Sequence, residues 1–238
     1  MESTPVKAVK KLDDEETPDQ ILGGAVSAQK SPRDRKMSSI EQQGSRLIKE
    51  KTFILPPQIV IKVEQLKDSK ILSGDYFGKM VSLLLNAGIT EFTSALLYRA
   101  SKDGFGERDF HNKSDNKGVT LTLIRTSTGH RIGGLTTQPW ESIQYGKFKS
   151  DPDAWVFSID HPSVYRVKQR LGYGAIECAK GLGARFGGGD IWISHDSNVN
   201  SNSYVNPETY AYGGRHLLDG KGLVTFTAKE IEVFLITY

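Results

Sequence analysis

The feature that most constrains the fold is a series of short apolar runs separated by turn-forming residues. In VTLTLIRT (119–126), aliphatic residues alternate with threonines, which is typical of a β-strand. The turn residues STG (127–129) follow, and HRIGGLTT (130–137) is predicted to return as the partner strand of a hairpin. Because the chain has no regular alternation of strands and helices, these runs favour an antiparallel arrangement over a parallel sheet.

Other segments extend this pattern and add a few helices. The further runs of strand length are AWVFSI (154–159), GAIECA (174–179), DIWIS (190–194), LVTFT (223–227) and EIEVFLITY (230–238). Apolar residues at helical spacing in 73–88 predict a helix with Ser73 as its N-cap and Gly88 at its end. Residues 107–113 predict one or two helical turns. The expected fold is α+β and mainly β: a two-sheet antiparallel β-sandwich with a few flanking helices.

The chain divides into three segments by composition. Residues 1–45 are polar, charged and free of aromatics, so they cannot bury enough apolar area to offset their ordering entropy, and a disordered N-terminal arm is expected. Residues 46–69 are richer in aliphatics, but Pro56 and Pro57 forbid a continuous helix, so a linker or accessory segment is expected. Residues 70–238 are expected to form the folded domain.

Charge and cysteine content exclude several classes of protein. Lys and Arg number 31 against 28 Asp and Glu, and they are interleaved along the chain, so a nucleic-acid partner is not expected. No segment approaches the run of about 18 apolar residues that predicts a transmembrane helix. Cys178 is the one cysteine, which rules out an intrachain disulfide and suits a reducing, intracellular compartment. We expect Cys178 to be a small buried residue.

Five segments, in this order, carry a resemblance to a known family. They are LLYRASKDGF (96–105), VTLTLIRTSTGHRIGGLTTQPW (119–140), SDPDAWVFSI (150–159), RFGGGDIWISHDSNVNSNSY (185–204) and FTAKEIEVFLI (226–236). Together they resemble the TLDc domain family, so residues 70–238 are identified as a TLDc-like domain.

The resemblance implies a fold, a function and a partner. The implied fold is the two-sheet β-sandwich that the apolar runs predict independently. The implied function is a non-enzymatic, intracellular interaction domain in oxidative-stress resistance, with no cofactor. The implied partner is a protein, a subunit of the vacuolar proton-pumping ATPase, which the domain would bind and regulate. That partner would place the protein in the cytoplasm, at the periphery of acidic organelles.

The stretch GGGDIWISHDSNVNSNSY (187–204) combines glycines, acids, a histidine and a polar tract, but its spacing matches neither a phosphate-binding loop nor a catalytic triad. Gly187, Gly188 and Gly189 run into an acidic residue and a strand, whereas a phosphate-binding loop needs a helix N-terminus behind it. We therefore expect these glycines to be structural and to permit close packing. His195, Asp196 and Ser197 are consecutive. Neighbouring residues of a strand point to opposite faces, so these three side chains cannot converge as a catalytic triad.

A calcium loop fits the same stretch only in part. Asp196, Asn198 and Asn200 occupy loop positions 1, 3 and 5 of an EF-hand. Ser201 stands where Gly is expected, and Pro207 where a bidentate Glu is needed. A weak cation site and a polar turn both remain open at this stage, and no catalytic, cofactor or metal residue is assigned.

The remaining candidates are an acidic pair in the last strand and a glycine pair in the hairpin. Glu230 and Glu232 are two positions apart, so they share one face of the last strand. Three roles are open for the pair: a solvated strand face, a docking surface or buried hydrogen-bonded anchor, or a catalytic acid–base pair. Gly133 and Gly134 predict a bulge or a close backbone approach.

The interaction candidates are therefore Asp190, His195, Asp196, Asn198, Asn200, Glu230 and Glu232. The alternative hypothesis is an enzyme or a cation-binding protein with an unrecognised polar site near Asp190, His195 and Glu230.

Overall fold

A computed structural model of the protein describes residues 66–168 and 174–238. The predicted disordered arm at 1–45 lies outside the described residues, as does most of the 46–69 segment. All described residues belong to one compact unit. Leu66, at the start of the described residues, is buried and packs with the core.

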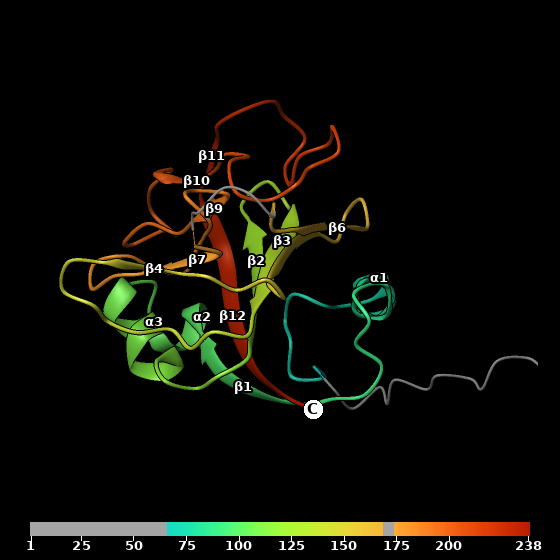
Figure 1. Ribbon diagram of the computed structural model, residues 1–238, viewed down its shortest axis with the longest axis horizontal. Helices are drawn as coiled ribbons and strands as arrows, with labels where there is room; N and C mark the ends of the chain where they lie inside the picture. The colour runs from blue at the N-terminus through green and yellow to red at the C-terminus, as the bar shows by residue number, and fades with distance from the viewer. Residues whose placement is uncertain (1–65, 169–173) are drawn as a thin grey trace, which may run out of the picture. The chain divides into compact units, whose positions relative to one another are not determined.

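The fold consists of two antiparallel sheets of six strands each, which confirms the predicted sandwich (Figure 1). The first sheet has the order β1-β12-β2-β3-β5-β6 and the second has the order β11-β10-β9-β8-β7-β4. The strands of the first sheet are β1 (Thr93–Arg99), β2 (Thr120–Thr126), β3 (Arg131–Thr136), β5 (Trp155–Ser158), β6 (Ser163–Arg166) and β12 (Ala228–Thr237). Those of the second are β4 (Lys147–Lys149), β7 (Ile176–Cys178), β8 (Arg185–Phe186), β9 (Ile191–Trp192), β10 (Ser203–Val205) and β11 (Val224–Phe226).

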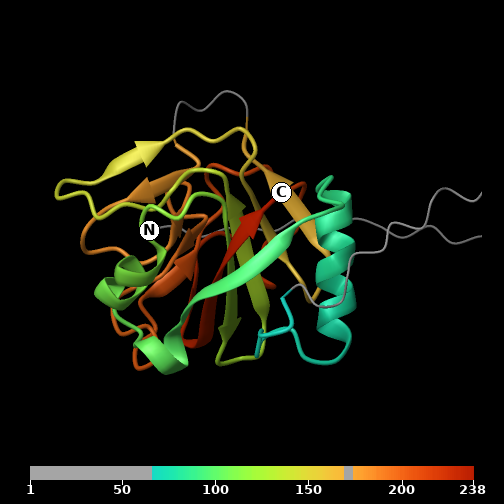
Figure 2. The same cartoon turned by 90° about the horizontal axis from the view of Figure 1, so that it is seen from below.

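Among the described residues, three helices flank the sheets. They are α1 (Asp75–Asn86), α2 (Ala100–Asp103) and α3 (Glu107–Ser114). Both views place α1 on one side of the first sheet, and α2 and α3 with the second sheet on the other (Figures 1 and 2). The predicted helical turns at 107–113 correspond to α3.

Two apolar clusters occupy the two sides of the first sheet. Between the sheets, Trp140 and Phe186 pack edge to face with ring centroids 5.4 Å apart. On the other side, Met80 and Leu84 of α1 pack in one cluster with Trp155. Burying each such large side chain contributes about 1.5–3 kcal/mol. The first sheet is therefore covered on both faces, and β12, which lies between β1 and β2, is buried along most of its length.

The start of α1 corrects one detail of the sequence analysis. The N-cap is Gly74, and no side chain caps the helix, so the predicted role of Ser73 is wrong. Gly74 has a φ of 62°, a left-handed conformation that glycine adopts without strain, and the chain enters the helix only after it. At the other end, the Gly88 N–H donates to the Leu85 carbonyl oxygen, as a helix-ending glycine should.

The glycine pair in β3 marks a close approach. Both residues pair in regular register with β2, so there is no bulge between them. A Cβ atom on Gly133 would lie 2.0 Å from the Thr122 carbonyl oxygen. A Cβ atom on Gly134 would lie 2.5 Å from the ring of Phe186 in the second sheet. The absent side chain at Gly134 thus allows the two sheets to pack together.

Candidate interaction site

The loop that follows β9 is held in shape by one asparagine side chain. The Asn200 amide nitrogen donates to the carbonyl oxygens of His195 (2.8 Å) and Asp196 (2.9 Å). Its amide oxygen accepts from the Ser194 hydroxyl (2.9 Å) and from the Asn202 N–H (2.9 Å). All four hydrogen bonds lie within the loop, so Asn200 defines its conformation.

His195 joins this loop to helix α3. Its Nδ1 contacts the carboxylate of Glu107, and its Nε2 lies 3.0 Å from the Asp196 carboxylate. The hydrogen bond with Glu107 raises the pKa of His195 above its ordinary value of 6.5. Partial burial raises the pKa of Glu107, but its own backbone N–H and the His195 ring lower that pKa more, so the net shift is downward. The pair is therefore an ionic contact at mildly acidic pH.

The outer side of the loop is exposed and carries mixed chemistry. The His195 side chain is 62% exposed and that of Asp196 is 56% exposed. Asn198 is exposed, and Val199 is an apolar residue that is 77% exposed. Asp196 has a φ of 49°, an uncommon conformation for a residue other than glycine, and the Asn200 hydrogen bond to its carbonyl oxygen supports it. These four side chains form what we call the β9 loop surface: His195, Asp196, Asn198 and Val199.

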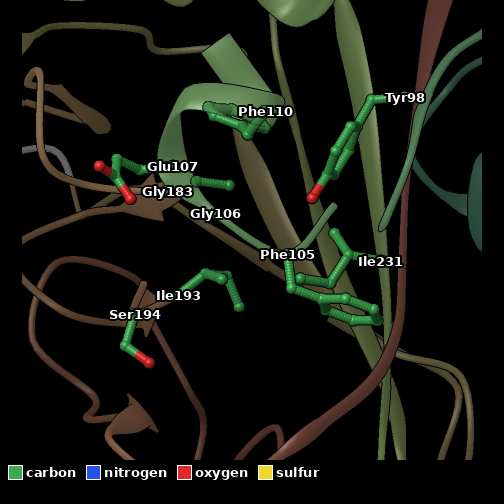
Figure 3. A pocket seen from close by; sticks show the side chains of 10 residues that line it. Tyr98, Phe105, Gly106, Glu107, Phe110, Gly183, Ile193, Ser194 and Ile231 are labelled. Atoms are coloured by element: carbon green, nitrogen blue, oxygen red, sulfur yellow. The ribbon is translucent and has the colours of Figure 1, made fainter. Parts of the chain in front are cut away.

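The cavity beside this surface is too small for a substrate. Figure 3 shows its lining, which includes Tyr98, Phe105 and Phe110 on one side and Ile193 and Ser194 on the other. Its volume is about 10 Å³, which is about the space that a single water molecule needs. The cavity therefore does not make the β9 loop surface into an active site.

Asp190 lies apart from the exposed loop, in the interior. Its carboxylate accepts hydrogen bonds from the backbone N–H groups of Glu208 (3.0 Å), Thr209 (2.8 Å) and Tyr210 (3.0 Å). The side chain is fully buried. Asp190 thus fixes the backbone after β10.

Each of the three glycines before Asp190 lies where a side chain would clash with a neighbouring one. A Cβ atom on Gly187 would lie 2.0 Å from the Asp190 carboxylate. One on Gly188 would lie 2.5 Å from the Glu208 carboxylate, and one on Gly189 would lie 2.9 Å from the Tyr204 ring. In this structure the three glycines serve packing.

Glu230 and Glu232 are buried. Glu232 is fully buried, and it accepts hydrogen bonds from Arg99 Nε (2.9 Å), the Lys70 N–H (2.9 Å) and the Ser69 hydroxyl (2.5 Å). Glu230, 8% exposed, accepts from the Ser101 N–H at 2.9 Å. Of the alternatives that the sequence left open, the buried hydrogen-bonded anchor describes both residues, and a solvated face does not. Glu232 ties the segment before α1 to the first sheet.

Glu107 is a partner of His195 that the sequence does not predict. The two residues are separated by 88 positions, and nothing in the local pattern around Glu107 distinguishes it from any acid in the first turn of a helix. Only the packing of α3 against the loop after β9 brings them together.

No metal site is evident in the part of the chain that the structure describes. Within 66–168 and 174–238, no group of three or more His, Cys, Asp or Glu side chains comes together as a set of metal ligands. In the stretch that partly fits a calcium loop, the Asn200 oxygen already accepts two hydrogen bonds.

Cys178 is fully buried, as expected. Burial raises the pKa of its thiol, which keeps it in the unreactive protonated form.

The comparisons with known proteins agree with this fold. A family model described as the TLDc domain matches residues 65–237. A search of curated proteins gives no significant match. Among the described residues, no helix has the length and apolar character required to cross a membrane. Because the family match covers most of the chain, the protein belongs to the TLDc domain family.

Proposed function

We propose that this protein is a non-enzymatic interaction domain that acts in oxidative-stress resistance by binding the vacuolar proton-pumping ATPase. Family membership carries this proposal, because the TLDc domain is associated with the oxidative-stress response and is generally non-catalytic. The protein would work in the cytoplasm, at the periphery of the acidic organelles that hold the pump.

We further propose that the β9 loop surface contacts the partner. Its side chains are exposed while the loop backbone is already ordered by Asn200, so little conformational entropy is lost on binding. Val199 offers an apolar contact surrounded by polar groups, an arrangement that protein interfaces commonly use.

Of the three residues in the alternative hypothesis of an enzyme or cation site, two have structural roles. Asp190 and Glu230 each accept backbone hydrogen bonds in the interior. His195 is engaged with Glu107 on the exposed loop. The three side chains belong to three separate networks, which favours the interaction proposal over catalysis.

Binding of the full chain to the purified vacuolar ATPase tests the proposal directly. The informative variant is Val199→Asp, and we expect it to weaken binding about tenfold, as the loss of an interface hot spot would. The matched control is Leu223→Asp, which makes the same change at another exposed apolar residue, 57% exposed. Binding should be unchanged in the control.

Two results would contradict the proposal at different levels. If the unmodified chain does not bind the ATPase, the partner is wrong. If Val199→Asp and Leu223→Asp weaken binding equally, the partner stands and the β9 loop surface is not the interface. A stress-survival assay with the same variants links binding to protection.

A further inference from the structure

A second cavity, separate from the one in Figure 3, lies beside helix α3. Arg108 and Asn112 are four residues apart and therefore lie on the same face of α3, and both line this cavity. The other side is formed by Ser142 and Lys180. The Lys180 N–H donates to the Ile143 carbonyl oxygen (2.9 Å), which joins the two loops that carry these residues.

The buried side of the cavity is rigid. His111, 7% exposed, has Nδ1 2.7 Å from the Asp115 carboxylate and Nε2 2.9 Å from the Leu182 carbonyl oxygen. The Ser142 hydroxyl donates to the other Asp115 oxygen at 2.8 Å. His111 and Ser142 therefore already use their hydrogen-bonding groups within the protein. The side-chain donors left for a ligand are those of Arg108, Asn112 and Lys180.

The acidic groups near the cavity are already engaged. Glu107 contacts His195, Asp109 accepts the Gly106 N–H, and Asp115 is held as described above. By contrast, the side chains of Arg108 and Lys180 make no hydrogen bond or ion pair to any residue that the structure describes. Two cations, Arg108 and Lys180, therefore line a cavity in which the carboxylate of Glu107 contacts His195 and lies close enough to Arg108 for that charge to lower the Glu107 pKa.

We propose that this cavity binds a single oxyanion group, a carboxylate or a phosphate. Arginine and lysine are the usual donors to such groups, and Asn112 adds a neutral donor on the same helix face. The volume is about 220 Å³, below the roughly 300–1,000 Å³ of sites that hold larger ligands, so the cavity suits one anionic group rather than a nucleotide. The group can come from a free anion or from a side chain of an acidic peptide. The site goes beyond the proposed function, because none of the four residues of the β9 loop surface lines it.

Titration of the full chain with inorganic phosphate, followed by ¹⁵N NMR at constant ionic strength, tests the site. We expect saturable shifts confined to residues 107–112, 142–143 and 179–182, with a Kd on the order of 1 mM because exposed cations contribute little each. The double variant Arg108→Gln and Lys180→Gln should weaken binding at least about tenfold. The matched control, Lys221→Gln and Lys229→Gln, makes the same change in net charge at exposed positions elsewhere and should leave binding unchanged.

A second arm distinguishes the two sources of the anion. The probe is a short blocked peptide of alternating glutamate and alanine. If the peptide produces the same shifts at lower concentration than phosphate, the site takes a side chain of a protein; if only phosphate does, it takes a free anion. The proposal is overturned if neither probe shifts these residues, if the shifts follow surface lysines throughout the chain, or if the control pair weakens binding as much as the cavity pair.

Discussion

The carboxylates of Glu232 and Asp190 differ from that of Asp196 in one respect that decides what each can do. The first two are fully buried, and each accepts three hydrogen bonds. Asp196 is 56% exposed and lies on an ordered loop beside His195. A buried carboxylate with every partner in place is unavailable to a partner protein, and its loss destabilises the fold because its buried partners are left uncompensated, whereas an exposed carboxylate adds little stability and can take part in recognition.

All three residues are interaction candidates by sequence, because each carries a carboxylate, and Asp190 and Asp196 lie close together in the chain. Burial separates them. Substitutions of the interior acids should therefore have large effects on stability, and substitutions on the exposed loop should have small ones.

The largest effect is expected for Glu232→Gln. The substitution breaks the buried ion pair with Arg99 and presents an amide N–H₂ group to donors, so the free energy of unfolding should fall by about 3–5 kcal/mol. Chemical denaturation measures this, with the exposed Glu91→Gln as the control that should change little. A loss below about 1 kcal/mol, the range of surface pairs, would show that Glu232 is not a buried anchor.

A smaller loss is expected for Asp190→Asn. The variant keeps an oxygen for part of the network but loses the charge that strengthens three backbone hydrogen bonds, so unfolding should become easier by about 2–3 kcal/mol. The matched control is Asp196→Asn, the same change on the exposed loop, which should stay within about 0.5 kcal/mol. Equal losses in the two variants would contradict the division between interior and surface acids.

The smallest effect concerns the contact between His195 and Glu107, and it is best measured as a titration. Because the folded pKa of His195 is raised, its stabilising contribution is full below 6.5 and is lost as pH rises through the folded value. Because the folded pKa of Glu107 is lowered, its contribution is present above 4.5 and is lost as pH falls through the folded value. The contact between His195 and Glu107 is therefore strongest between about pH 4.5 and pH 6.5.

An NMR titration of the His195 ring should give a midpoint above 6.5, and Glu107→Gln should move it back toward 6.5. The variant Asp103→Asn, which alters another acid near α3, serves as the control and should leave the midpoint in place. A midpoint that does not respond to Glu107→Gln would mean that the two side chains do not interact in solution.

Elements long enough to show a periodicity are those that the sequence predicts best. The β2–β3 hairpin was predicted because each strand is long enough to show its pattern and a recognisable turn joins them. Strand β9 lies inside the predicted run 190–194 but has only two residues, whereas β8, with two residues, and β4 and β10, with three each, are too short to show any periodicity. Their places in the second sheet come from partners far along the chain.

The candidate site divides in the same way. The polar loop after β9 was found from its composition, because asparagine and serine satisfy local backbone groups in turns. Its contact with Glu107 was not found, because that contact depends on how α3 packs. The anchoring role of Glu232 was one of several open alternatives, because alternation along a strand shows which residues share a face but not what covers that face.

The fold class, the family and the longer elements follow from the sequence, since strand alternation, helical spacing and turn residues act over a few neighbouring positions. The tertiary structure alone decided which polar residues are interior and which are exposed. It also decided which cations remain without a partner beside α3. The physical reason is that the energy of a charged group depends on the groups around it in space, and in a β-sandwich those groups come from distant parts of the chain.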